Sequence, residues 1–85
     1  MDFYVYILYS ELIDRFYVGC TGSMLKERLR KHNTKHSGFT GRANDWRLMY
    51  HESFQSQSDA YNREREIKNR KSRKFIEHLI LEKNG

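Results

Sequence analysis

The sequence has no proline, only one cysteine among its 85 residues, and no apolar run long enough to cross a membrane. A single thiol cannot form a disulfide within the chain, which favours a reducing compartment. The N-terminus also lacks the basic-then-apolar pattern of a secretory signal. These absences argue against a disulfide-stabilised secreted protein or a membrane protein, and we expect a cytoplasmic protein without membrane contact.

The chain also has fewer acidic than basic residues. It contains 16 Lys and Arg against 11 Asp and Glu, a formal net charge of +5, together with six tyrosines, five phenylalanines and one tryptophan. A small basic domain rich in aromatic residues is typical of proteins that bind a polyanion such as nucleic acid. A chain of this length suffices for one thin core, so we expect residues 1–85 to form a single domain.

Two short runs of β-branched and aromatic residues, at 3–9 and 16–19, predict an antiparallel hairpin because the connector between them is short and polar. Side chains alternate along a strand, so Tyr17 and Gly19 share one face, which Tyr6 on the first strand can join. Gly19 would leave room beside these phenols for the close approach of a ligand. Tyrosines that merely pack on the sheet would give the same pattern.

The rest of the chain predicts a third strand and three helices. We expect an amphipathic helix over residues 24–33, a polar loop over 34–45, a strand over 46–54, a helix over 58–69 and a last helix after Ser72. Hydroxyl side chains suited to capping precede the helices, namely Thr21 or Ser23, Ser58, and Ser72. The predicted fold class is α+β, a small three-stranded antiparallel sheet flanked by about three helices.

Two of the predicted helices carry side chains that could meet at one site. Arg28 and His32 lie one turn apart, close enough to serve the same site, although a solvated arginine is the alternative. In the next helix Glu64 falls on a stripe of small and apolar residues, where a carboxylate is unusual. Glu66 faces away from that stripe. An ion pair with Lys68, four residues on, is the alternative role for Glu64.

In this order of elements the chain resembles the GIY-YIG nuclease superfamily, most closely its small stand-alone members. Tyr4-Val5-Tyr6 stands where the family has its GIY element, Tyr17-Val18-Gly19 where it has YIG, and Arg28 where it has a helix arginine. The resemblance covers residues 3–80 and is shared with the nuclease domains of the excision-repair incision subunit and of GIY-YIG homing endonucleases.

Three features depart from the family pattern. The first element keeps only its final tyrosine, and the segment 20–26 is one residue longer than usual. Some members have a lysine just after the YIG glycine, where this chain has Cys20, so this chain must do without any proton transfer by that lysine or use His32 for it. A zinc site at Cys20, His32 and His36 is disfavoured because the chain lacks paired ligand spacing.

The resemblance implies a catalytic set drawn from two strands and two helices, namely Tyr6, Tyr17, Arg28, His32 and Glu64. Glu64 would bind one Mg²⁺ or Mn²⁺, ions that need few protein ligands. Arg28 would donate two hydrogen bonds to the scissile phosphate. Tyr6 is our first choice to bind or deprotonate the attacking water, with Tyr17 as orienter. Because a phenol is a poor base at neutral pH, His32 could accept the proton instead.

Basic residues outside this set are candidates for phosphate contacts. Residues 63–74 hold seven basic and two acidic side chains. A solvated helical surface is the alternative. We predict nucleic-acid contacts by Lys26, Lys35, Arg42, Arg63, Lys68, Arg70 and Lys71. Such contacts add affinity without sequence information.

The predicted function is therefore a divalent-metal-dependent endonuclease that hydrolyses phosphodiester bonds in DNA, structure-selective and linked to DNA repair or recombination. The alternative is a non-catalytic nucleic-acid-binding module of the same fold. A separate protein partner could direct the domain to its substrate, and we expect a monomer or weak dimer.

Overall fold

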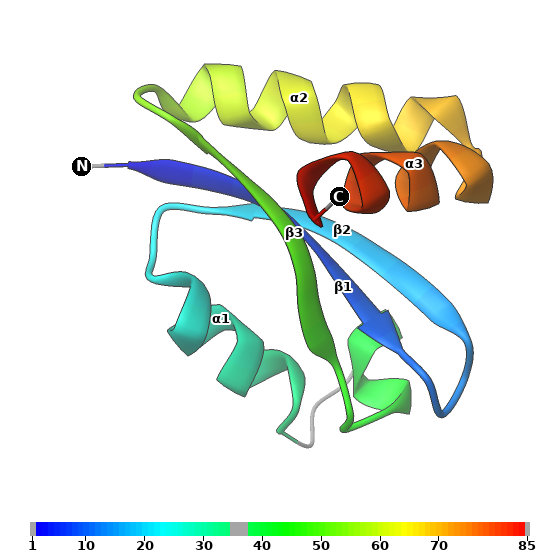
Figure 1. Cartoon of the computed structure of the whole chain (residues 1–85). Coiled ribbons are helices and arrows are strands. Elements are labelled where there is room, and N and C mark those ends of the chain that lie inside the picture. Colours follow the sequence, from blue (N-terminus) through cyan, green and yellow to red (C-terminus); the bar gives the residue numbers. More distant parts are fainter. Residues whose placement is uncertain (1, 35–37, 85) are drawn as a thin grey trace.

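In the part of the chain that the structure describes, residues 2–34 and 38–84, three antiparallel strands form one sheet. This computed structural model places β1 (Phe3–Ser10) between β2 (Arg15–Thr21) and β3 (Arg47–Phe54). Helix α1 (Leu25–His32) covers one face, and α2 (Gln57–Arg70) and α3 (Arg73–Asn84) cover the other (Figure 1). The predicted α+β fold, with a small antiparallel sheet and three α-helices, is confirmed.

The central position of β1 explains why its residues are apolar on both faces. Val5 and Ile7 pack on the side of α2 and α3, whereas Tyr6 and Leu8 pack on the side of α1. All four side chains are buried. The sheet therefore separates two hydrophobic cores, and β1 contributes to both.

Strand β3 does not keep the simple alternation that its sequence suggests. Ile7 pairs with Tyr50, but the next residue, Leu8, pairs with Leu48, so Met49 is an extra residue in a β-bulge. The bulge places Tyr50 in the core under α2 and α3 and Leu48 in the core under α1. This is why neither face of the segment looks cleanly polar in the sequence.

Two of the predicted helix caps are wrong and one is confirmed. The residue before α1 is Met24, which makes no side-chain cap, while Thr21 Oγ1 accepts the N–H of Ser23 in a local turn instead. Helix α2 starts earlier than predicted because Ser56, rather than Ser58, accepts the backbone N–H of Asp59. Ser72 caps α3, accepting the N–H of Phe75 as predicted.

The predicted polar loop over residues 34–45 contains a short 3₁₀ helix, η1 (Phe39–Arg42), and is partly buried. Thr40 and Ala43 are enclosed, and the loop is fixed by Trp46, whose indole N–H donates to the carbonyl of Thr40. Asn33 closes the other end through two hydrogen bonds to the backbone of Trp46. None of the helices in the described residues has the length and apolar character needed to span a bilayer.

Candidate functional site

Tyr6 and Gly19 lie opposite each other on β1 and β2, and the Tyr6 side chain fits only because Gly19 has no side chain. A Cβ atom on Gly19 would lie 2.6 Å from Tyr6 Oη and 2.7 Å from Tyr6 Cζ. The phenol, 1% exposed, therefore passes over the glycine. Our expectation that Gly19 makes room for a ligand needs correction, because the space it leaves is filled by Tyr6.

The Tyr6 hydroxyl starts a buried chain of hydrogen bonds. Tyr6 Oη lies 2.9 Å from His32 Nε2, and His32 Nδ1 lies 2.9 Å from Thr40 Oγ1. The ring of Tyr17 lies 5.0 Å from the His32 ring and 6.4 Å from the Tyr6 ring, between centroids. The structure thus brings together the two motif tyrosines and the histidine of α1, as the sequence predicted. Thr40 could not be predicted from the sequence, since only the backbone of η1 brings it to His32.

Arg28, one turn before His32, is half-buried and also reaches this cluster. Its Nε is buried with no hydrogen-bond partner among the described residues. Burial raises the pKa of Tyr6, and the nearby Arg28 guanidinium only partly offsets this effect. Tyr6 is therefore a neutral phenol at neutral pH. An arginine with an unsatisfied buried N–H beside a neutral phenol is suited to receive an anion.

Glu64 comes from α2, on the opposite face of the sheet. Its side chain is 12% exposed and lies 2.9 Å from Lys68 Nζ, so the inward position and the ion pair that we weighed as alternatives occur together. Glu66 is 61% exposed and pairs with Arg63, which agrees with its predicted outward orientation. Glu64 also lies close enough to affect Cys20, because the pKa of this thiol is raised by burial and by the Glu64 carboxylate.

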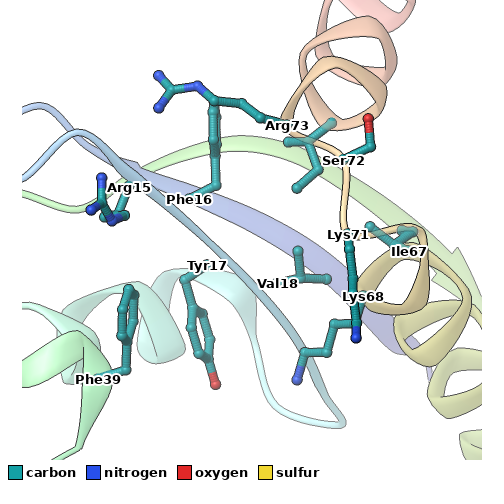
Figure 2. Close-up of a pocket in the computed structure, with 11 residues that line it drawn as sticks. Arg15, Phe16, Tyr17, Val18, Phe39, Ile67, Lys68, Lys71, Ser72 and Arg73 are labelled. Carbon is teal, nitrogen blue, oxygen red and sulfur yellow. The ribbon is translucent and has the colours of Figure 1, made fainter.

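Side chains from the two faces meet because β2 is an edge strand. The Lys68 ammonium lies 5.9 Å from the centroid of the Tyr17 ring, and the Glu64 charge contributes to the raised pKa of Tyr6. Side chains from α1 and α2 therefore contribute to one site at the exposed edge of β2. Figure 2 shows Tyr17 on β2 with Lys68 of α2 extending toward it.

The described residues contain no group of three or more His, Cys, Asp and Glu side chains placed to hold a metal ion. Glu64 supplies one hard carboxylate, and Mg²⁺ is commonly held by one or two carboxylates, several waters and substrate phosphates. The neighbouring Cys20 thiol is protonated at neutral pH because its pKa is raised, so it adds no anionic ligand. The residues fit a hard divalent ion that is bound jointly with a phosphate.

The predicted nucleic-acid-binding residues separate into different environments. Lys68 and Lys71 line an open groove over β2, beside Tyr17 and Phe39 (Figure 2). Arg42, Arg70 and Lys26 are exposed at other places, Arg42 over the ring of Phe39 and Arg70 over that of Phe75. Lys35 lies outside the described residues.

Arg63 is less available to a phosphate than the predicted contacts Lys68 and Lys71, because it is paired with two carboxylates of the protein and is largely buried. Its Nη2 lies 3.0 Å from Glu52 Oε2, and its Nη1 pairs with Glu66. The side chain is only 25% exposed. Phe39, in contrast, lines the groove and was missed, because an isolated aromatic residue in a polar loop carries no periodic signal.

The comparisons agree with this arrangement. The chain matches the model of the GIY-YIG catalytic domain over residues 2–77, which contain the sheet, α1, α2 and every residue of the candidate site. Comparisons with curated proteins and with solved structures gave no match. A family model that spans most of the chain, together with the expected sheet and helices, shows that this protein belongs to the GIY-YIG catalytic-domain family.

Proposed function

We propose that this protein is a divalent-metal-dependent endonuclease that hydrolyses phosphodiester bonds in DNA. Membership of a nuclease superfamily supports nuclease-type chemistry. The observation that carries the proposal is the convergence, beyond the rim of β2, of a buried Tyr6–His32 pair, a half-buried Arg28 and the inward-facing carboxylate of Glu64. A binding surface needs cations, but it needs neither a buried phenol–imidazole pair nor an acid.

Arg28 would hold the scissile phosphate. Its guanidinium can donate two parallel hydrogen bonds to phosphoryl oxygens, a geometry that lysine lacks. The buried Nε has no partner among the described residues, and an unsatisfied buried donor is costly, so an incoming anion would relieve an existing penalty. We propose that this donor is reserved for the phosphate.

Tyr6 and His32 would handle the proton of the attacking water. The raised pKa of Tyr6 makes its phenolate scarce at neutral pH, so we propose that His32 Nε2 accepts the proton through the 2.9 Å contact with Tyr6 Oη. The contact of His32 Nδ1 with Thr40 would then hold the imidazole in one orientation. Tyr17, whose tilted ring lies beside those of this pair, would orient the water or the phosphate.

Glu64 would hold the divalent ion, Mg²⁺ or Mn²⁺. When bound, the ion would supply positive charge to the phosphoryl oxygens and to the leaving oxygen. Lys68 now neutralises this carboxylate and is itself half exposed, so its ammonium can turn toward solvent or a phosphate. The ion pair keeps a largely buried carboxylate compensated before the ion arrives.

We further propose that substrate choice depends on the shape of the nucleic acid. Cations at the rim of β2 would contact phosphates, which carry no base information. Flapped, branched or damaged DNA in repair or recombination offers such shapes, and a protein partner could bring the domain to it. The Glu64–Lys68 ion pair is the observation that favours the alternative, a non-catalytic binding module, because it gives Glu64 a structural role without chemistry.

The test is cleavage of labelled duplex, single-stranded, flapped and branched DNA, and of RNA, with Mg²⁺, with Mn²⁺ and with chelator. We expect Glu64→Gln to reduce cleavage by about 100-fold or more, the usual loss for one group that stabilises the transition state, while binding persists. Glu66→Gln, two residues along α2 and turned to solvent, is the matched control and should cleave normally. Intact binding without cleavage by the wild type would instead indicate the binding module.

A further inference from the structure

Phe39 lies at the candidate site without being buried there. Its ring is stacked on that of Tyr17, with 6.3 Å between centroids and 19° between ring planes, and lies 6.1 Å from the ring of Trp46. It is nevertheless 40% exposed. The backbone of η1 is held by Trp46 and the neighbouring Thr40 by His32, so the exposed ring sits on a fixed support.

The groove beside Phe39 carries positive charge. Its lining along β2 and the α2–α3 junction includes no carboxylate and four cations, Arg15, Lys68, Lys71 and Arg73. Two of these are ion-paired with carboxylates outside the lining, Lys68 with Glu64 and Arg73 with Asp14 and Glu77. Lys71 is exposed and makes no ion pair within the described residues. The Arg42 guanidinium lies 5.7 Å from the centroid of the Phe39 ring. The groove, of about 500 Å³, is therefore complementary to an anionic polymer.

Figure 2 shows how these two features are arranged. The rings of Phe39 and Tyr17 stand side by side at one end of the groove, and the amines of Lys68 and Lys71 lie across it, with Val18 between them. Phosphates held by the lysines would place a base toward the aromatic pair. Aromatic side chains beside a cationic groove are the usual means of binding single-stranded nucleic acid.

We propose that Phe39 is a stacking platform for one unpaired base next to the scissile phosphate, so that the substrate is single-stranded or locally unpaired at the cleavage site. A base within a duplex is already stacked on both faces and cannot use the platform without leaving the helix. This inference rests on the proposed function and adds the substrate class to it.

The test compares binding to a strand of about twelve thymidines, within the range of known single-strand sites, with binding to a strand of equal length that has no bases. Both keep the phosphates, and chelator prevents cleavage. Loss of one stacked base weakens binding by about 5- to 150-fold, so the wild-type preference for the thymidine strand should fall by that factor in Phe39→Ala. Affinity for the base-free strand and for a blunt duplex should not change.

Two further variants sharpen the measurement. Phe39→Leu keeps most of the apolar volume without an aromatic face, so it should lose most of the preference and remains informative if Phe39→Ala unfolds. Tyr61→Ala removes an aromatic ring of similar exposure, 50%, that lies outside this groove, and should keep the preference. Equal weakening on both strands, or an equal effect on the duplex, would overturn the platform.

Cleavage of the thymidine strand by the wild type, measured in parallel with Mg²⁺ and Mn²⁺, separates this inference from the proposed function. A preference that depends on Phe39, without cleavage of this strand or of any nucleic acid in the panel above, leaves the platform standing and removes the nuclease proposal. Cleavage without a preference that depends on Phe39 supports the nuclease proposal and overturns the platform. Absence of binding to either strand would overturn the platform directly.

Discussion

At the scale of single residues, the phenol of Tyr6 fills the space over Gly19. A methyl group on Gly19 would overlap this phenol, which cannot move away because it is enclosed and bonded to His32. We expect Gly19→Ala to lower the free energy of unfolding by about 1–3 kcal/mol, the usual cost of overpacking. Chemical denaturation gives this value, and any cleavage should fall with it because the phenol is displaced.

Gly22→Ala is the comparison for this prediction. Its added methyl would meet only the half-buried ring of Phe3, at 3.1 Å, so we expect a change within about 0.5 kcal/mol. If Gly19→Ala were as stable as Gly22→Ala, the Tyr6 ring would have to be mobile, and its proposed role as a fixed proton carrier to His32 would be lost.

At the scale of elements, α2 positions Glu64, and the first turn of α2 is fixed by Ser56. Ser56→Ala removes the acceptor for the N–H of Asp59 and should cost about 1 kcal/mol of stability. Ser58→Ala changes the residue that the sequence alone suggested as the cap and should stay within about 0.5 kcal/mol. Urea unfolding of the two variants distinguishes them, and a larger loss for Ser58→Ala would mean that α2 starts later.

The same elements show what the sequence could predict. The order of strands and helices followed from hydrophobic periodicity, and the inward side of Glu64 followed from its wheel position. The bulge at Met49 could not be predicted, because it depends on pairing with β1 rather than on local sequence. The cap of α2 was misassigned because several serines stand near its start, and the cap of α1 because that helix starts after Met24, which has no capping side chain.

The site residues also divide into those whose position could be predicted from the sequence and those whose position could not. Regular strands and helices hold four of the site residues, Tyr6, Tyr17, Arg28 and His32. The geometry of these elements fixes the spacing of the side chains, so their proximity could be predicted from the sequence. Thr40 and Phe39 lie in a loop whose path depends on hydrogen bonds from Trp46 and Asn33. Nothing in the local pattern reveals that path, and both residues emerged only with the structure.

At the scale of the whole molecule, the excess positive charge divides into cations used within the fold and cations that remain available. Lys71 is available, and its backbone is left-handed, with φ of 48°, a conformation that favours glycine. We therefore expect Lys71→Gly to be no less stable than the wild type. The dependence of log K on log salt should become shallower by about 0.7 for one lost phosphate contact to a single strand.

Arg63→Ala is the contrasting variant for the salt experiment. Glu52, only 23% exposed, would lose its cationic partner and keep the Tyr50 hydroxyl, so we expect a loss of about 1–3 kcal/mol in stability with no change in the salt slope. Binding measured over a range of salt concentrations, with thermal unfolding of each variant, tests both expectations. A slope that changes for Arg63→Ala but not for Lys71→Gly would reverse the assignment.

The division of the core by the sheet has a consequence for how activity depends on integrity of the fold. Arg28 and His32 are anchored in the core beneath α1, whereas Glu64 is anchored in the core beneath α2 and α3, and only the thickness of β2 separates them. Detachment of either layer would leave the other layer's side chains in place but unable to cooperate. If the proposed site is catalytic, a partly unfolded chain could still bind nucleic acid through its cations but would not cleave it, because that site needs side chains from both layers.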